Sequence, residues 1–426
     1  MRLLLVGGGG REHAMLKKLR ENPFVTEVFA LPGNGGIAED ALCVPIRTTD
    51  VKTIAAFARE KAVDFAVVAP DDPLCLGLVD LLRAKGIPAF GPDQRAAIIE
   101  GSKVFSKGLM KKYGIPTAAY EVFDNVQAAN GYLADCKYPI VIKADGLALG
   151  KGVLICQNQN EAVDAIYSIM EERVFGESGR QVVVEEFLTG PEVSVLCFTD
   201  GTTIKPMVSS MDHKRALDFD EGLNTGGMGA IAPNPYYTNE IAECCMREIF
   251  LPTVNAMNTE GRTFRGCLYF GLMLTESGPK VIEYNCRFGD PETQAVLPLL
   301  QSDLLTIMQA TVNGTLHETE VAFSNQASCC VVLASGGYPK AYETGKEIKG
   351  LDSLDKANAH CFHAGTKRLA DGKIVTSGGR VLNITATADT LSEAVEKTYR
   401  AAEHITFENM HMRHDIGLRA LNATKR

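Results

Sequence analysis

The sequence of 426 residues lacks the features that mark membrane and metal-binding proteins. No apolar run approaches the roughly 18 residues that a membrane span requires, and Met1 and Arg2 lead straight into a strand-like run instead of a signal peptide. None of the 12 cysteines form the paired C-x-x-C spacing of a zinc site, and most lie inside apolar runs. We therefore expect a soluble, cytoplasmic protein with reduced, buried thiols and no membrane partner.

The chain also has no excess of positive charge. Its 43 Lys and Arg residues against 52 Asp and Glu residues give a formal net charge of −9, which argues against a nucleic-acid-binding surface. An anionic ligand would therefore be bound locally, by loop amides, by particular lysines or arginines, or by a metal ion. No internal repeat or low-complexity stretch is present. A hydrophobic content of 46% is sufficient for the buried hydrophobic cores of a globular protein.

Three regions with different patterns follow one another along the chain. Up to about residue 100, short β-rich runs alternate with helical patterns, which predicts βαβ units on a parallel sheet and a Rossmann-like domain over 1–101. Residues 102–325 mix strands and helices too irregularly to repeat that pattern, so we expect a central α+β domain. Residues 326–426 suit a small α+β domain, and the fold class is α/β overall.

Two glycine-rich loops should lie at the same edge of the first sheet. "LLLVGGGGREH" contains the first strand and its loop, and the sequence GNGG at 33–36 follows the second strand. Gly7 and Gly9 match half of a dinucleotide fingerprint, but Glu12 takes the third glycine position and no carboxylate ends the second strand, so NAD binding is weakly supported. Backbone N–H groups in two such loops suit a phosphorylated small molecule, and two tight turns on a sheet explain them equally well.

Another candidate phosphate loop lies in "YPIVIKADGLALGKGVLIC". A strand ending at Lys143 precedes a glycine-rich turn from Gly146 to Gly152 that contains Lys151. The turn is not a Walker A loop, because its spacing differs and Gly152 stands where Ser or Thr would hold magnesium. Glycines permit close approach and the two lysines supply charge, so a mobile phosphate cover is favoured over a plain hairpin.

Acidic and amide side chains mark two later strands. Glu185 and Glu186 end one strand, where a solvated edge is the ordinary explanation and a contact with adenine and ribose is the alternative. In "KVIEYNCRFGDPETQ", Glu283, Asn285 and Arg287 alternate and should point to one face. Two oxygen ligands and a guanidinium suit a hard cation with phosphates, magnesium first. A buried salt bridge would leave Asn285 unexplained.

Six motifs occur in order over nearly the whole chain: "GSKVFSK", "IKADGLALGKGV", "VVVEEFLTGPEVS", "MDHKRALDFDEGLNTGGMGA", "IEYNCRFGDPETQ" and "TSGGRVL". Together they resemble the phosphoribosylamine–glycine ligase family of the ATP-grasp superfamily, which acts in purine synthesis. The E-x-N-x-R strand marks only the superfamily, whereas "NTGGMGA" with "RFGDPE" and "GGRVL" is more specific. The resemblance makes the region 102–325 an ATP-grasp domain with a mobile lid at about 115–190.

The resemblance implies an ATP-dependent ligase that joins glycine to 5-phosphoribosylamine through glycyl phosphate. Magnesium or manganese would be the metal ion, and the enzyme would be a monomer or weak homodimer. Alternatives are an ATP-grasp ligase for another acid or amine, a nucleotide-binding regulatory module without catalysis, and, more distantly, a dinucleotide oxidoreductase. The intact set of Glu283, Asn285 and Arg287 argues against the regulatory module.

The resemblance also implies roles for individual residues, and Asp71 takes the place of a substrate-binding glutamate of the family. The residues that would contact ATP are Lys103, Lys143, Gly146, Gly150, Lys151, Gly152, Glu185, Glu186, Phe187, Leu188 and Glu192. The residues that would contact the other substrates are Gly8, Gly9, Gly10, Asn34, Gly35, Gly36, Asp71, Asp212, Asn224, Thr225, Gly226 and Arg287. The residues that would act in catalysis are Arg287, Lys143, Asp212 and Lys214, and those that would bind the metal ion are Glu283 and Asn285.

Overall fold

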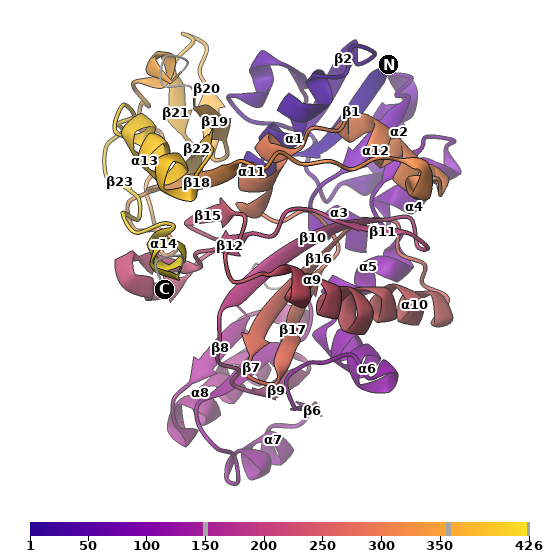
Figure 1. The fold of residues 1–426 in the computed structure, drawn as a ribbon, viewed down its shortest axis with the longest axis vertical. Coiled ribbons are helices and arrows are strands. Elements are labelled where there is room, and N and C mark those ends of the chain that lie inside the picture. Colours follow the sequence, from indigo (N-terminus) through magenta and orange to yellow (C-terminus); the bar gives the residue numbers. More distant parts are fainter. Residues whose placement is uncertain (148–151, 355–358, 424–426) are drawn as a thin grey trace.

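The computed structural model describes residues 1–147, 152–354 and 359–423. Three sheets dominate it, and a fourth extends from the bottom of the molecule. Figure 1 shows the N-terminal and C-terminal sheets side by side at the top, with the central sheet below them. The chain is thus of mixed α/β class, as the sequence predicted.

The N-terminal region forms the predicted parallel sheet. Its order is β3-β2-β1-β4-β5, so the connections leave β1 in opposite directions, toward β2 and, later in the chain, toward β4. The loops after β1 and β4 therefore meet at a switch point of the sheet, where α/β proteins bind ligands. The elements are β1 (Arg2–Gly7), α1 (Gly10–Arg20), β2 (Glu27–Pro32), β3 (Leu42–Cys43), α2 (Val51–Glu60), β4 (Phe65–Val68), α3 (Asp71–Cys75), α4 (Leu78–Ala84), β5 (Ala89–Phe90) and α5 (Gln94–Gly101).

The central region contains two four-stranded antiparallel sheets, with orders β6-β9-β7-β8 and β11-β10-β16-β17. The first of these sheets is the one at the bottom of Figure 1 and contains most of the predicted lid. The elements are α6 (Lys103–Tyr113), β6 (Tyr120–Phe123), α7 (Val126–Leu133), β7 (Ile140–Ala144), β8 (Val153–Cys156), α8 (Gln159–Met170), β9 (Val182–Glu186), β10 (Glu192–Thr199), β11 (Ile204–Pro206), α9 (Asn239–Cys245), α10 (Leu251–Thr259), β16 (Gly266–Thr275), β17 (Gly278–Asn285), α11 (Glu292–Val296) and α12 (Leu304–Asn313).

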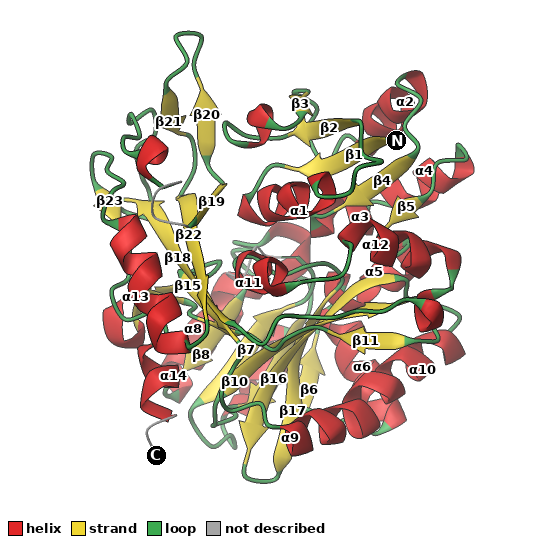
Figure 2. Ribbon diagram, turned by 45° about the horizontal axis from the view of Figure 1, so that its top comes forward, coloured by secondary structure: helices red, strands yellow, loops and turns green. Residues whose placement is uncertain are grey.

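The C-terminal sheet takes strands from both sides of the predicted boundary at residue 326. Its order is β12-β15-β18-β22-β19, and β12 and β15 belong to the segment 211–232. Figure 2 shows α13 lying along β18 and β22. The elements are β12 (Met211–Asp212), β13 (Arg215–Leu217), β14 (Glu221–Asn224), β15 (Gly229–Ala232), β18 (Ala327–Ser335), β19 (His360–His363), β20 (Thr366–Arg368), β21 (Ile374–Thr376), β22 (Arg380–Ala388), α13 (Leu391–Ala402), β23 (Met410–His411) and α14 (Leu418–Ala423).

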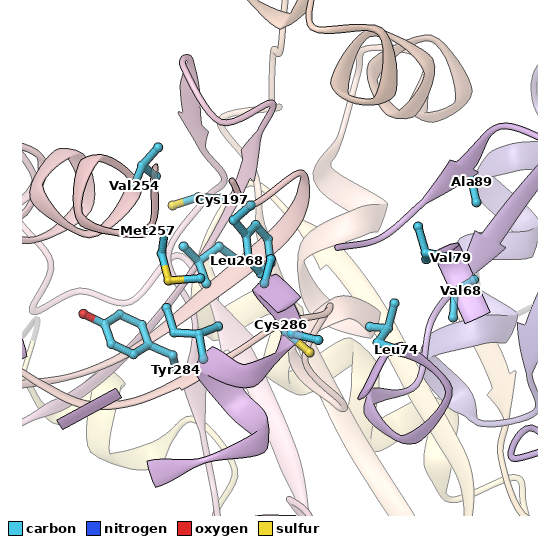
Figure 3. Packing of buried hydrophobic residues seen from close by; sticks show 14 of the residues in the cluster. Val68, Leu74, Val79, Ala89, Cys197, Val254, Met257, Leu268, Tyr284 and Cys286 are labelled. Carbon is cyan, nitrogen blue, oxygen red and sulfur yellow. The ribbon is translucent and has the colours of Figure 1, made fainter. Parts of the chain in front are cut away.

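One hydrophobic cluster joins the N-terminal sheet to the central sheet. Figure 3 shows Val68 and Leu74 on one side and Leu268, Tyr284 and Cys286 on the other, all in the same cluster of buried residues. Because the two regions share a core, their relative position is set by side-chain packing and not by the connecting chain alone.

Among the described residues, no helix is both long enough and apolar enough to cross a bilayer.

This shared core makes a first prediction. Phe270 is fully buried, and its ring centroid lies 4.3 Å from that of Phe250 and 5.5 Å from that of Tyr284. Phe270→Ala should lower the free energy of unfolding by about 3–5 kcal/mol, because transfer energy is lost and a cavity remains. Urea denaturation measures the change. Phe24→Ala, at a ring that is 75% exposed, should change the free energy by no more than about 0.5 kcal/mol. Equal losses of unfolding free energy in the two variants would contradict the assignment of Phe270 to the shared core.

Candidate active site

The end of β17 lies at the centre of the candidate site. Tyr284 and Cys286 point into the shared core, and Glu283, Asn285 and Arg287, which are less buried, lie on the other face of the chain. Alternation along an extended chain thus separates core residues from polar ones. The polar face is therefore anchored by the packing behind it.

Glu283 is a half-buried carboxylate that faces several cations. Its Oε1 lies 3.7 Å from Nζ of Lys214, which is also 3.2 Å from Oε2 of Glu192. Burial alone would raise the pKa of Glu283, but the ammonium groups of Lys214, Lys143 and Lys103 outweigh it and hold the pKa below its usual range. Glu283 is therefore ionised at neutral pH. A carboxylate and the Asn285 amide oxygen are hard ligands, so this donor set fits magnesium or manganese.

A buried charge triad lies beside this carboxylate. Oε2 of Glu185 is 3.0 Å from Nζ of both Lys107 and Lys143, and Lys143 also donates to the Ile282 carbonyl at 3.0 Å. Within the described part of the chain, Oε1 of Glu185 has no hydrogen-bond partner. Burial lowers the pKa of Lys107 to about 8 despite Glu185. Sequence reasoning missed Lys107, although its i,i+4 spacing from Lys103 on one helix could have indicated it.

The N-terminus of α6 holds the start of the candidate phosphate cover. Nζ of Lys103 donates to the Gly146 carbonyl at 2.8 Å, and Ser102 Oγ and the Val104 N–H donate to the Asp145 carboxylate at 3.0 Å. Gly146 has a φ of 93°, a left-handed conformation that favours glycine. Burial lowers the pKa of Lys103, with Glu283 opposing the shift. Gly150 and Lys151 lie outside the described residues.

The connection from β9 to β10 carries the candidate adenine residues. The carboxylate of Glu186 accepts from the Ala119 N–H at 3.0 Å and from Lys280 Nζ at 3.2 Å, so it ties β9 to the central sheet. Phe187 is exposed and Leu188 half-buried, which leaves apolar side chains open to a flat ring. Glu192 begins β10 and faces Lys214.

Asp212 and Lys214 come from the turn at β12, opposite β17. Oδ1 of Asp212 is buried and without a hydrogen-bond partner among the described residues. Burial and the nearby Glu292 carboxylate raise the pKa of Asp212 well above its usual range. Glu292 is 4% exposed and accepts from the Tyr269 hydroxyl at 3.1 Å. Neither Glu292 nor Tyr269 was identified as a site residue from the sequence.

Arg287 is held in place by a residue that sequence reasoning also missed. Its Nη2 lies 2.9 Å from Oε1 of Glu100, whose Oε2 accepts from the Cys286 N–H at 2.6 Å. Burial would lower the pKa of Arg287, but Glu100 and Asp71 outweigh it and keep the guanidinium charged. The structure thus brings Asp71, at the start of α3, and Glu100, near the end of α5, to the end of β17. No local sequence signal marks Glu100.

The first glycine loop wraps around a carboxylate of its own helix. Glu12 is 1% exposed, and its Oε2 accepts from the Gly9 N–H at 2.6 Å. Its Oε1 accepts from Arg11, which also donates to the Phe288 carbonyl at 3.0 Å. The residue that breaks the dinucleotide fingerprint is therefore the third residue of α1, and its carboxylate accepts the N–H of the N-cap residue Gly9. A Cβ on Gly9 would lie 3.3 Å from Oδ2 of Asp290, and one on Gly10 would overlap the side chains of α11 and β22.

The second glycine loop is organised by Asn34. Its Oδ1 accepts from the N–H groups of Gly36 at 3.0 Å and Ile37 at 2.9 Å, and its Nδ2 donates to the Gly8 carbonyl at 3.0 Å. The Gly35 N–H donates to the Thr366 carbonyl at 3.1 Å. The two loops that the sequence places at one sheet edge are thus joined by a side chain. In the structure, the amides of the second loop are engaged within the protein.

Arg380 of the "TSGGRVL" motif holds the segment 224–227. Its Nη1 donates to the carbonyls of Gly226 at 2.7 Å and Asp290 at 2.8 Å. Thr225 donates to the Lys214 carbonyl at 2.8 Å, and the Gly226 N–H donates to the hydroxyl of Tyr338 at 3.0 Å. Three distant motifs therefore meet at one guanidinium. Asn224, the first residue of this segment, is also the last residue of β14.

The chain matches three family models that together cover most of its length. These describe phosphoribosylglycinamide synthetase as an N domain at residues 1–100, an ATP-grasp (A) domain at 101–293 and a C domain at 328–419. The phosphoribosylamine–glycine ligase of Vibrio cholerae serotype O1 is 47% identical over 99% of this chain and 99% of its own. That of Caldanaerobacter subterraneus is 47% identical over 98% of this chain and 99% of its own.

Solved structures agree with these relatives. The crystal structure of phosphoribosylamine–glycine ligase from Thermotoga maritima has a TM-score of 0.86 and 35% identity, and covers 98% of this chain and 100% of that one. The biotin carboxylase domain of the Hydrogenobacter thermophilus 2-oxoglutarate carboxylase has a TM-score of 0.74 at 18% identity, over 100% of this chain and 94% of that one. The second likeness concerns the fold alone.

The histidine beside Asp212 makes a prediction about acid stability. His213 is buried, its Nε2 accepts from the Gly417 N–H at 3.2 Å, and burial lowers its pKa to about 4. Between pH 6.5 and 4 the unfolded imidazole therefore binds a proton that the folded one does not. The free energy of unfolding should fall by about 3 kcal/mol from this group as the pH drops from 7 to 4.

Urea denaturation at a series of pH values measures this slope. His213→Gln cannot titrate, so its stability should fall less steeply over that range than that of the unaltered chain. The other buried histidines and the carboxylates are the same in both proteins and cancel in the difference. Parallel pH profiles would contradict a neutral, buried His213.

Proposed function

The chain belongs to the phosphoribosylamine–glycine ligase family of ATP-grasp enzymes, which act in purine biosynthesis, and we propose how its residues join glycine to 5-phosphoribosylamine. ATP is converted to ADP and phosphate in the reaction. The observation that carries the proposal is the polar face of Glu283, Asn285 and Arg287, with Lys214 3.7 Å from the Glu283 carboxylate. Such a face can neutralise phosphates and hold an acyl phosphate.

In the first step, an oxygen of the glycine carboxylate attacks the γ-phosphorus of ATP and ADP leaves. Lys103 and Lys143 neutralise the phosphates, and the loop from Gly146 to Gly152, including Gly150 and Lys151, covers them. Catalysis here is mostly positioning and charge neutralisation. Magnesium or manganese, held by Glu283 and Asn285, supplies further positive charge at the phosphate oxygens when it is bound.

The adenosine part of ATP lies in the connection from β9 to β10. Glu185, Glu186, Phe187 and Leu188 line the adenine, and Glu192 contacts the ribose. The geometry supports this assignment because the buried Glu185 leaves one oxygen free of partners among the described residues, while its other oxygen holds Lys143. A base bound there lies next to a lysine that reaches the phosphates.

Glycine and its acyl phosphate lie between β12 and β17. Asp212 and Lys214 face this space from one side, and Arg287 from the other, where Glu100 aims its guanidinium. Arg287 stabilises the oxyanions as they form. Asn224, Thr225 and Gly226 line the same space on the segment that Arg380 holds.

In the second step, the amine nitrogen of 5-phosphoribosylamine attacks the acyl carbon of glycyl phosphate and phosphate leaves. Asp71 and the two glycine loops, with Gly8, Gly9 and Gly10 in the first and Asn34, Gly35 and Gly36 in the second, bind this substrate. Water must be excluded between the steps, because it would hydrolyse an acyl phosphate. We further propose that the domains end at residues 101 and 325. The enzyme is a monomer or weak dimer, and its location is cytoplasmic.

The function is tested by ADP release in a coupled assay. Glycine, ATP and freshly generated 5-phosphoribosylamine should release ADP rapidly and form the ligated product, which chromatography detects. Omission of glycine, of the amine or of the divalent cation should abolish ligation. Turnover with another acid or amine in preference to this pair would instead indicate a different ATP-grasp ligase.

Glu283→Ala tests the metal site. The variant should lose ligation by a factor of at least about 10², because one ligand of the cation and one counter-charge for three lysines are lost together. It should also need a higher magnesium concentration for whatever activity remains. Glu318→Ala, at a side chain that is 70% exposed, is the matched control and should behave as the unaltered chain does. Near-normal turnover of Glu283→Ala would contradict the assignment.

A further inference from the structure

An edge strand of the C-terminal sheet docks on the two glycine loops through its backbone. β19 is the outer strand of its sheet and pairs with β22 on one side only. On the other side, the His363 N–H donates to Nδ1 of His13 at 2.8 Å, and the His363 carbonyl accepts from Nδ2 of Asn34 at 2.6 Å. Two side chains of the N-terminal domain thus occupy the backbone positions that a neighbouring strand would use.

The hydrogen bond from His363 fixes the state of the His13 ring. Because Nδ1 accepts, the proton of the neutral imidazole is on Nε2. His13 is 2% exposed and His363 is 7% exposed. Burial and the neighbouring His363 lower the pKa of His13, and burial and Arg368 lower that of His363 to about 4. Both rings are therefore neutral near pH 7, and His13 remains an acceptor.

The same two rings limit the shape of the second glycine loop. A Cβ on Gly36 would lie 2.4 Å from Cγ of His363 and 2.6 Å from Cε1 of His13, closer than any side chain could approach. His363 Nδ1 is 3.1 Å from Oγ1 of Thr366, whose carbonyl accepts from the Gly35 N–H. The loop is therefore pressed between α1 and the strands β19 and β20.

Asn34 carries this contact to the first glycine loop. Its Nδ2 reaches the carbonyls of His363 and Gly8, and its Oδ1 binds the amides of its own loop at Gly36 and Ile37. One side chain therefore connects three segments: both glycine loops and β19. If β19 moved away, Asn34 would lose one partner and the two loops would lose their common support.

We propose that His13 is a positioning residue for the phosphorylated amine substrate, acting with Asn34 to hold β19 against the two glycine loops so that they are shaped before the substrate binds. The inference rests on the proposed function, in which these loops bind 5-phosphoribosylamine. A preformed site binds more tightly because less ordering is required on binding. The residues proposed for ATP and glycine lie on other elements, so the bridge serves the second step only.

The test separates the two steps with two amines. Hydroxylamine is small and traps glycyl phosphate as glycyl hydroxamate without needing a sugar-phosphate site, whereas ligation needs 5-phosphoribosylamine. His13→Leu removes the acceptor. His13→Asn keeps an acceptor at the position of Nδ1 and is the matched control.

For His13→Leu we expect the KM for 5-phosphoribosylamine to rise by about 10- to 100-fold, the range that loss of positioning produces. Its rate of hydroxamate formation and its KM for glycine and ATP should stay within about twofold of the unaltered chain. His13→Asn should restore most of the lost affinity. His13→Ala, which also removes the acceptor but leaves a smaller side chain, should reproduce the same split and serves if His13→Leu does not fold.

Equal losses in ligation and hydroxamate formation would assign the bridge a general structural role and overturn the proposal. An unchanged KM for 5-phosphoribosylamine in folded His13→Leu or His13→Ala would also overturn it. If the unaltered chain formed neither hydroxamate nor ADP with glycine and ATP, the proposed function itself would fail, and this inference with it.

Discussion

The balance between buried carboxylates and the cations facing them is the constraint on which the site depends. Burial disfavours every charge in it, yet the carboxylate of Glu283 stays ionised because Lys214, Lys143 and Lys103 surround it. In the neighbouring triad, one carboxylate stabilises two cations, because Oε2 of Glu185 lies 3.0 Å from the ammonium groups of both Lys107 and Lys143. Removing Glu185, Lys107 or Lys143 would leave an unpaired buried charge, which is costly. Negative phosphates entering such a site meet cations that are already held in place by internal partners.

The domains do not act as separate units around this site. The C-terminal sheet takes β12 and β15 from the middle of the chain, so β12, which contains Asp212, is linked through β15 to β18, which lies about a hundred residues after β15. Arg380 then fastens the carbonyls of Gly226 and Asp290 at 2.7 and 2.8 Å. A motif near the C-terminus is therefore in direct contact with two motifs of the ATP-grasp region. Its guanidinium orders backbone that the substrates would face.

Local patterns predicted the fold well and the supports of the site poorly. The parallel N-terminal sheet followed from alternating β-rich and helical segments, because such periodicity is encoded within a few residues. Sequence reasoning missed Glu100, Lys107 and Glu292, because each acquires its meaning from a partner far along the chain. Glu100 is an ordinary helical glutamate until Arg287, nearly two hundred residues later, lies 2.9 Å away.

The four glycines that open the chain illustrate the same difference. From sequence, Glu12 breaks a dinucleotide fingerprint; in the structure it is buried and accepts the Gly9 amide at 2.6 Å. A carboxylate of the protein therefore already occupies the start of α1, where a dinucleotide phosphate would otherwise bind. With the amides of the second loop also engaged, the two loops present a rigid surface whose shape depends on Asn34 and β19. If these loops bind the sugar phosphate as proposed, recognition would depend on its fit to a preformed surface that the C-terminal domain helps to shape.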